Sequence, residues 1–256
     1  MATTPTRVLV VGATGRTGRH VMAAAADRGL TPVALASDEK HARGILGDAE
    51  IVVGDLVDAA SLAKAVKDID GIIFVHGSDN DSRADSVQRI DYGGVVNVMR
   101  ALGDRRPRIV LQTSIFVTRR DHYFNAGGHA LDWKRRSERV VRLSGAPYTI
   151  VRPGWLDGGE AGGHVTIEQG DTGEGGISRE VLGTLLVEAL LTESALGRTF
   201  EACSGPGRAT RDWVALFGRA AQDAVGALDA VEDTANMPLE DEPARVRSDL
   251  AEFRAH

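Results

Sequence analysis

Glycines recur at three-residue spacing directly after an apolar run near the start of the chain. Val8–Val11 is followed by Gly12, Gly15 and Gly18, and a stretch with helical periodicity begins at once. Gly12 permits a tight turn, Gly15 has no Cβ to collide with a pyrophosphate, and Gly18 lets the helix lie close to the sheet. The N–H groups of such a helix N-terminus attract an anion. The arrangement predicts a dinucleotide-binding turn, with glycines that serve only the turn as the alternative. Its remaining predicted cofactor contacts are Thr14, Arg16 and Thr17.

The residues after the second apolar run bear on which dinucleotide binds. Ser37 and Asp38 follow Thr31–Ala36. An acidic side chain at this place binds a ribose 2′-hydroxyl and repels a 2′-phosphate, whereas Ser37 donates a hydrogen bond to a phosphate. Basic residues that would lie nearby are Arg16, Lys40 and Arg43. The pattern favours NADP(H) over NAD(H), although these charges also suit a solvated surface.

Two further strand ends carry residues suited to the same ligand. Asp55 and Leu56 follow the third predicted strand, where a carboxylate and the next backbone N–H reach the amine and ring nitrogen of adenine. A helix cap by Asp55 or Asp58 is the alternative. His76 and Gly77 follow the fourth predicted strand, at the edge where open parallel sheets bind ligands. We expect a backbone contact to the cofactor ribose there.

Positioning these residues requires a regular alternation of strands and helices. Short apolar runs alternate with segments of helical periodicity, which is typical of a parallel sheet covered by helices on both faces. The predicted strands are Arg7–Val11, Thr31–Ala36, Glu50–Val53, Gly71–Val75, Arg108–Thr113 and Tyr148–Val151. The predicted helices are Gly15–Arg28, Lys40–Leu46, Ser61–Lys67, Ser86–Leu102 and Leu131–Leu143.

The composition changes after this alternation. Gly154–Gly176 is rich in glycine, including Gly158, Gly159, Gly162 and Gly163, which predicts loops around one short strand. Later elements are predicted at Val165–Glu168 (strand), Arg179–Leu191 (helix, capped by Ser178), Arg198–Ala202 (strand) and Trp213–Ala221 (helix). We expect one α/β domain over residues 1–256, a Rossmann-type doubly wound parallel sheet. Within it, residues 154–210 contribute a small C-terminal substrate-binding portion and 222–256 a charged C-terminal appendage.

Composition excludes several other classes of protein. The 256 residues carry a formal charge of −6 and a single cysteine, which argues against a nucleic-acid partner and against a disulfide or Cys-rich zinc site. No apolar run approaches the length of a membrane span, and no secretory signal is visible. We expect a cytoplasmic protein with a small-molecule substrate and no metal site, and the oligomeric state stays open.

Several of these motifs occur together in one known group of proteins. The chain contains Gly12–Gly18, Gly54-Asp55-Leu56, Thr113-Ser114, Lys134 and Val151-Arg152-Pro153-Gly154 in this order. In this it resembles the atypical short-chain dehydrogenase/reductases, and within them the NAD(P)H-binding, NmrA-like group that includes biliverdin reductase B and quinone reductase relatives. The likeness covers roughly Arg7–Ala202.

The resemblance implies roles for individual residues. Ser114 would polarise a substrate carbonyl, and Lys134 would hold the nicotinamide ribose. Typical members carry a proton-donating Tyr four residues before this Lys, but here that position is Ala130. His129 and Tyr123 are the nearby acid–base candidates, of which we include His129 in the catalytic set. A plain loop histidine is the alternative, as is a capping role for Ser114.

The residues after the sixth predicted strand complete the expected site. Pro153 and Gly154 would bring the backbone close to the nicotinamide amide. Tyr123, Trp155 and Leu156 would line the substrate pocket, although a Trp after such a turn also suits a core position.

The predicted function is that of an NADP-dependent reductase. It would transfer hydride to a small conjugated carbonyl, quinone or flavin-like substrate without the usual Tyr. Two alternatives stay open: a non-catalytic NADP(H) sensor that binds a partner protein through the charged segment Asp229–His256, and a redox-neutral isomerase or dehydratase.

Overall fold

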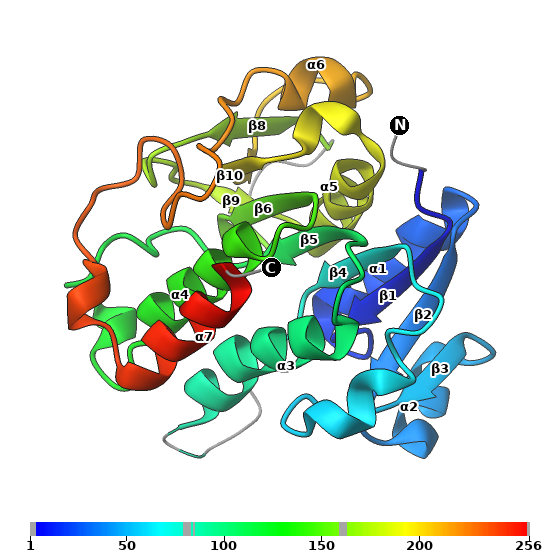
Figure 1. The fold of residues 1–256 in the computed structure, drawn as a ribbon. Helices are drawn as coiled ribbons and strands as arrows, with labels where there is room; N and C mark the ends of the chain where they lie inside the picture. The colour runs from blue at the N-terminus through cyan, green and yellow to red at the C-terminus, as the bar shows by residue number, and fades with distance from the viewer. Residues whose placement is uncertain (1–3, 79–82, 84, 159–162, 255–256) are drawn as a thin grey trace.

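A mostly parallel sheet forms the centre of the molecule (Figure 1). The structure, a computed structural model, describes residues 4–78, 83, 85–158 and 163–254, so Gly159 and Gly162 lie outside the described residues. The sheet has eight strands in the order β3-β2-β1-β4-β5-β6-β10-β8, and β8 is antiparallel to β10. The strands are β1 (Arg7–Val11), β2 (Thr31–Ala36), β3 (Glu50–Val53), β4 (Gly71–Phe74), β5 (Arg108–Gln112), β6 (Tyr148–Pro153), β8 (Val165–Glu168) and β10 (Arg198–Ser204). This order, which reverses between β1 and β4, confirms the predicted Rossmann-type fold.

The strands are apolar because both faces of the sheet are covered. Alternate side chains of β1 enter two different cores: Leu9 and Val11 join one cluster, and Val8 and Val10 the other. All four are fully buried. A parallel strand covered on both sides has no polar face, so it reads as an unbroken hydrophobic run.

Helices from distant parts of the chain cover each face (Figure 1). The face of Leu9 and Val11 packs against α3 (Gly93–Leu102), α4 (Ala130–Leu143) and α7 (Ala244–Arg254). The face of Val8 and Val10 packs against α1 (Arg16–Asp27), α5 (Arg179–Leu191) and α6 (Trp213–Phe217). A short helix, α2 (Glu39–Leu46), connects β2 to β3.

Two predicted helices are shorter than their apolar spacing indicated. The segment predicted as helix at Ser61–Lys67 forms a 3₁₀ helix at Ala59–Ala63, begun by the Asp58 carboxylate accepting from the Ala60 N–H at 3.0 Å. The helix predicted at Trp213–Ala221 ends at Phe217, directly before Gly218. Glycine is a poor helix former, so the helix stops there.

The helix predicted at Ser86–Leu102 has two parts. It starts as a π-helix at Val87–Tyr92 and continues as α3. The wide first turn buries Asp91 and Tyr92, and the Tyr92 hydroxyl donates to the Asp249 carboxylate of α7 at 2.8 Å. π-helical turns occur often at functional sites, and this one leads to the candidate site below.

Two parallel two-residue strands branch from the main sheet. β7 (Trp155–Leu156) pairs with β9 (Gly176–Ile177), and both lie between β6 and α5 in the chain. Gly154 joins β6 to β7 in a crowded place, since a Cβ there would lie 2.4 Å from the Gly175 oxygen. Glycine is therefore required at this junction.

The charged C-terminal segment lies against the domain. Its last helix, α7, lies beside α4 (Figure 1) and contributes Val246, Leu250 and Phe253 to the core. The run of bases on α4 is not a solvated face. Arg135 and Arg139 are fully buried and both contact Asp229, while Arg136 and Arg139 both contact Glu242. The carboxylates of this segment thus neutralise arginines of α4.

No helix in the described part of the chain combines the length and hydropathy needed to cross a membrane.

Candidate functional site

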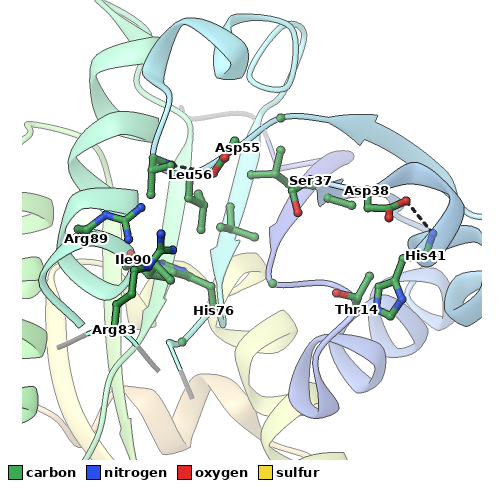
Figure 2. A pocket seen from close by; sticks show the side chains of 17 residues that line it. Thr14, Ser37, Asp38, His41, Asp55, Leu56, His76, Arg83, Arg89 and Ile90 are labelled. Carbon is green, nitrogen blue, oxygen red and sulfur yellow. Dashed lines mark hydrogen bonds between the residues drawn. The ribbon is translucent and has the colours of Figure 1, made fainter. Parts of the chain in front are cut away.

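A cleft of about 520 Å³ opens at the carboxyl ends of the first four strands (Figure 2). Its lining includes seven residues predicted from sequence as cofactor contacts: Gly12, Thr14, Ser37, Asp55, Leu56, His76 and Gly77. These residues come from four loops that are separated in the chain. They meet because β2, β1 and β4 are neighbours and all end at one edge of the sheet.

The glycine-rich turn has the geometry that a close-fitting anion requires. Gly12 has a φ of +93°, and a Cβ at this position would lie 2.7 Å from the His76 backbone. A Cβ at Gly18 would lie 2.0 Å from the Gly12 oxygen, so α1 passes directly over the turn. The first turn of α1 contains no acidic side chain. The helix N-terminus can therefore receive a phosphate without electrostatic competition from its own turn.

At the end of β2, the acidic residue is engaged in a helix cap. The Asp38 carboxylate accepts a hydrogen bond from the His41 N–H at 3.0 Å and so caps α2. Figure 2 shows this contact beside Ser37 and the His41 ring, both of which line the cleft. The basic residues predicted nearby do not line it. Arg43 donates to the Gly47 and Ala49 carbonyls, Lys40 is exposed, and Arg16 pairs with Asp157.

The predicted adenine contacts are held by a local network. The Asp55 carboxylate accepts from the Val57 N–H at 3.0 Å, and the Leu56 carbonyl accepts from the Asn97 amide at 2.7 Å. Of the two capping candidates, Asp58 begins the 3₁₀ helix. Asp55 forms the turn at the cleft instead, with its backbone N–H donating to Ser61 Oγ at 2.8 Å.

His76 forms the wall of the cleft between the turn and α3. Its Nε2 lies 3.0 Å from the Ile90 carbonyl oxygen. Burial lowers the pKa of His76, so the ring is neutral at neutral pH and donates from Nε2. The buried Nδ1 then has a lone pair with no hydrogen-bond partner among the described residues. The Nε2 contact ties the end of β4 to the π-helical turn that contains Ile90.

Lys134 is held by an acid that the sequence interpretation missed. Its Nζ lies 2.6 Å from Asp91 Oδ1, and Asp91 Oδ2 accepts from the Ser78 N–H at 3.1 Å. Burial opposes the charged carboxylate, but the Lys134 ammonium lowers the pKa of Asp91. The available signal was Asp91 itself, an acid at the start of the largely apolar segment Asp91–Asn97.

Ser114 lies at the carboxyl ends of β5 and β6, beside Pro153. These two strands are parallel neighbours, and the Ile115 N–H donates to the Pro153 carbonyl at 3.2 Å. Ser114 is half-buried. Neither Ser114, Pro153, Gly154 nor Lys134 lines the 520 Å³ cleft. The predicted nicotinamide contacts thus lie outside this cleft, farther along the same edge of the sheet.

A buried ion-pair network supports this half of the site and was not predicted. The Glu138 carboxylate accepts from the Thr113 hydroxyl and from the Arg152 guanidinium, each at 2.7 Å. Burial opposes the charge of Glu138, yet Arg152 and Arg142 lower its pKa to about 2. The network joins the residue before Ser114 to the residue before Pro153, so it fixes the ends of β5 and β6.

His129 lies apart from the cleft. It precedes α4 with a φ of +55°, its ring is exposed, and Nδ1 lies 3.4 Å from the Asp132 carboxylate. This places the imidazole at the start of α4 and on the surface.

The predicted substrate residues Tyr123 and Trp155 belong to one group of rings. This aromatic cluster consists of Phe116, His122, Tyr123, Phe124 and Trp155. Trp155 is 48% exposed and its ring centroid lies 6.0 Å from that of Phe116. Tyr123 is exposed as well, whereas Leu156 is half-buried against the core under α5. The cluster begins two residues after Ser114 and includes the residue after Gly154, so it borders the predicted nicotinamide end.

Comparisons with known proteins agree with this geometry. A family model described as NAD(P)H-binding matches residues 12–193, which is most of the chain. An uncharacterized chloroplastic protein of Arabidopsis thaliana is 30% identical over 84% of this chain and 75% of its own length. Sanguinarine reductase of Eschscholzia californica is 27% identical over 82% of this chain and 94% of its own length. A solved structure from Bacillus halodurans, provisionally named an NAD-dependent epimerase/dehydratase, superposes with a TM-score of 0.70 and 26% identity, over 84% of this chain and 99% of that one.

Proposed function

Because this chain belongs to the NAD(P)H-binding, NmrA-like family of atypical short-chain dehydrogenase/reductases, we propose that it is an NADP-dependent reductase of small conjugated carbonyl, quinone or flavin-like compounds. The observation that carries the proposal is that the cleft with the glycine turn, Ser114 and the Asp91–Lys134 pair all lie along one edge of the sheet. The cleft binds the cofactor, and Ser114 with the Asp91–Lys134 pair takes part in the reaction.

The residues of the cleft fit a nicotinamide dinucleotide. The glycine turn leaves no room for a Cβ at Gly12 or Gly18, so a pyrophosphate can approach its backbone closely. We assign the pyrophosphate to the turn, adenine to Asp55 and Leu56, and the nicotinamide ribose to Lys134. When bound, the dinucleotide supplies the hydride.

The chain itself orients the substrate. The Ser114 hydroxyl donates a hydrogen bond to the substrate oxygen and so favours negative charge developing there. Lys134, with its ammonium held by Asp91, fixes the ribose hydroxyls and adds positive charge nearby. Since Ala130 provides no hydroxyl and His129 lies on the surface apart from the cleft, the proton reaches the product from solvent.

The preference for NADP(H) rests on the end of β2. Asp38 also lines the cleft, but its Oδ1 is engaged in capping α2, which weakens its competition for a ribose 2′-hydroxyl. Ser37 and His41 line the cleft at that place, and both donate hydrogen bonds to a phosphate.

The substrate class follows from the aromatic cluster. Exposed rings next to the predicted hydride position favour a flat conjugated molecule that stacks on them. A planar acceptor also accepts hydride readily without a strong acid beside it, which suits the absence of the Tyr.

The test is a measurement of cofactor binding followed by a substrate screen. We expect calorimetry to detect NADP(H) binding, and NADPH oxidation in the presence of some quinones, flavins or enones. Absence of binding by both NADP(H) and NAD(H) would refute the proposal. Binding without oxidation across the panel would instead favour the sensor, and turnover without net NADPH consumption would favour the redox-neutral enzyme.

The sensor has less support in the geometry. Its proposed docking element was the charged tail, but Asp229, Asp233 and Glu242 pair with arginines of the domain. Their charges are therefore not displayed to a partner.

A further inference from the structure

A buried carboxylate from the second half of the chain holds the loop that follows Ser114. Asp171, which lies between β8 and β9, is only 3% exposed. It accepts hydrogen bonds from the Phe116 N–H at 2.5 Å, and from the N–H and the hydroxyl of Thr118, each at 2.8 Å. These partners precede it by 55 and 53 residues, so no local sequence pattern indicated the contact.

The loop depends on this carboxylate for its conformation. Phe116 has a φ of +73°, a left-handed conformation that is unfavourable for a bulky side chain and persists only where surrounding contacts enforce it. Phe116 and Thr118 are buried and lie outside helices and strands, and a buried N–H group requires an acceptor. Asp171 supplies that acceptor to the strained residue itself and to the residue two positions later.

The loop belongs to neither of the two cores that cover the sheet. Residues 115–117 are buried in a small separate cluster with Leu131 of α4. At the other side of the loop, the Ile115 N–H donates to the Pro153 carbonyl of β6 at 3.2 Å. The position of the loop is therefore set by β6 on one side and by the Asp171 carboxylate on the other.

This loop joins the two parts of the proposed reaction site. It begins directly after Ser114, whose hydroxyl is the proposed donor to the substrate oxygen. The Phe116 ring stacks on His122 with centroids 4.8 Å apart, and packs edge-to-face with Trp155 with centroids 6.0 Å apart. A shift of the loop would thus move the hydroxyl relative to the rings on which a flat substrate is proposed to stack.

The contacts of Asp171 are specific to this loop. Its carboxylate forms no ion pair in the part of the chain that the structure describes. Arg119 Nη2 donates to the Asp171 backbone carbonyl instead, at 3.4 Å, and its guanidinium lies 4.4 Å from the centroid of the Phe116 ring. A buried carboxylate is unfavourable unless hydrogen-bond donors satisfy it, and here all three donors belong to one loop.

We propose that Asp171 is a positioning residue of the reductase site, which sets the place of the Ser114 hydroxyl relative to the Phe116 and Trp155 rings and so aligns a flat conjugated substrate. The inference rests on the proposed function. Asp171 does not line the cofactor cleft. Its loss is therefore expected to impair the reaction of the bound substrate and to leave binding of the cofactor intact.

The main test compares Asp171→Asn with wild type in steady-state kinetics on the full chain, with NADPH as donor and 1,4-naphthoquinone or FMN as hydride acceptor. The amide keeps the size of the side chain but directs an N–H group at the donors of the loop. Since a misplacement of about 1 Å lowers a rate about 100-fold, we expect kcat to fall about 10-fold to 100-fold. The dissociation constant of NADPH, measured by calorimetry, should stay within about twofold of the wild-type value.

Two further measurements examine the loop itself. Thr118→Val removes the hydroxyl donor and should lower kcat by a smaller factor than Asp171→Asn does, whereas Thr118→Ser keeps a hydroxyl and should retain most of the wild-type kcat. Amide hydrogen exchange does not depend on activity. The Phe116 and Thr118 amides should exchange faster in Asp171→Asn than in wild type.

Asp212→Asn is the matched control. Asp212 also accepts from a backbone N–H, that of Ala215 at 2.8 Å, but it is exposed and caps α6. Its loss is expected to leave kcat and the affinity for NADPH unchanged. Thermal unfolding shows whether each variant is folded.

The outcomes distinguish the inference from the proposed function. If wild type binds neither NADP(H) nor NAD(H), or reduces no compound of the panel, the proposed function fails. If wild type is active but folded Asp171→Asn has the wild-type kcat, or exchanges its loop amides no faster, the inference alone is overturned. A parallel loss of kcat and NADPH affinity would indicate a general structural role and would overturn it too, as would a wild type that reduces other compounds but neither naphthoquinone nor FMN.

Discussion

At the scale of single residues, the candidate site contains side chains whose position is fixed by an ion pair or a hydrogen bond. Lys134 has a quarter of its side chain exposed, whereas its partner Asp91 is buried and also accepts from Ser78. The acid thus fixes the ammonium on one side and leaves the rest of it directed outward. Asp38 lines the cleft, and one of its two carboxylate oxygens caps α2.

Loss of the Lys134 ammonium is predicted to weaken binding of the cofactor. Lys134→Met would remove the proposed hydrogen bonds to the ribose and would leave Asp91 buried without its cation. Hydrogen bonds to charged groups contribute about 1.5–3 kcal/mol, so we expect NADPH to bind about 10-fold to 100-fold more weakly in calorimetry. Asp91→Asn should have a smaller effect in the same direction. Lys67→Met, on an exposed loop, is the matched control. Unchanged affinity in a folded Lys134→Met protein would contradict the assignment.

An acid at the end of β2 is predicted to change the choice of cofactor. Ser37→Asp places a carboxylate in the cleft, where it repels a 2′-phosphate and accepts from a 2′-hydroxyl. We expect affinity for NADPH to fall at least about tenfold and affinity for NADH to rise, measured by fluorescence titration. Ser37→Asn, with a similar size and no charge, should keep the wild-type preference. A variant that binds both cofactors as wild type does would exclude Ser37 from the phosphate site.

At the scale of elements, the contact between α1 and α5 decides where two helix starts meet. Close approach is possible because Gly183 has no side chain at the point where His20 passes. The placement of α5 against α1 therefore depends on a glycine that lies outside the four loops of the cleft.

Filling this contact is predicted to destabilise the protein. In Gly183→Ala the new Cβ would lie 2.8 Å from the His20 Cβ, which forces the helices apart. Overpacking of this kind costs about 1–3 kcal/mol, measured as a lower free energy of unfolding in urea. Gly44→Ala is the matched control, because nothing lies within 4 Å of a Cβ there and alanine is the better helix former. It should be neutral or stabilising by up to about 1 kcal/mol. Equal effects of the two substitutions would disprove the packing argument.

At the scale of the whole molecule, buried charges join the sheet to the C-terminal segment. Arg152 of β6 contacts Glu138 of α4 and Asp233 of the tail, each at 2.7 Å, and lies 3.5 Å from Glu201 of β10. Breaking such a buried pair costs about 3–5 kcal/mol, so the tail belongs to the folded unit. One member of the network is incompletely satisfied: Glu201 Oε2 is buried with no hydrogen-bond partner in the described residues.

Glu201 predicts a pH dependence of stability. Burial, with the nearby Asp171 carboxylate adding to it, raises the pKa of Glu201 to about 7 against the attraction of Arg152. The folded state then binds this proton more tightly than the unfolded state, so the contribution of Glu201 to stability is greatest below the unfolded pKa of 4.5 and is lost as the pH rises through about 7. The decrease is about 3 kcal/mol between pH 4 and pH 8.

The test compares Glu201→Gln with wild type in urea unfolding across this range. The amide of the variant is neutral at every pH. As the pH rises, the free energy of unfolding of Glu201→Gln should therefore increase by about 3 kcal/mol relative to that of wild type. Glu168→Gln, an exposed acid on the neighbouring strand β8, should show no such trend. A constant difference between Glu201→Gln and wild type would refute the shifted titration.

The fold and the phosphate turn were predictable because both depend on local patterns. A strand covered on both faces must be apolar, and a turn such as Gly12–Gly18 must lack side chains where atoms approach closely. Both requirements appear in a few consecutive residues. Seven predicted cofactor residues line the cleft for the same reason, since each follows a strand and parallel strands end at one edge.

Charge partners were decided only by the tertiary structure. Asp91 meets Lys134, Asp157 meets Arg16, and Asp229 meets Arg139 across separations of 43, 141 and 90 residues. The sequence does not show whether an acid or an arginine is solvated, caps a helix or is buried in an ion pair. Its role is set by the local dielectric and by the partner that folding places beside it. The amino-acid sequence by itself thus determined the sheet, the turn and the family. Packing between distant elements decided which carboxylates pair with Lys134, with Arg16 and with the arginines of α4.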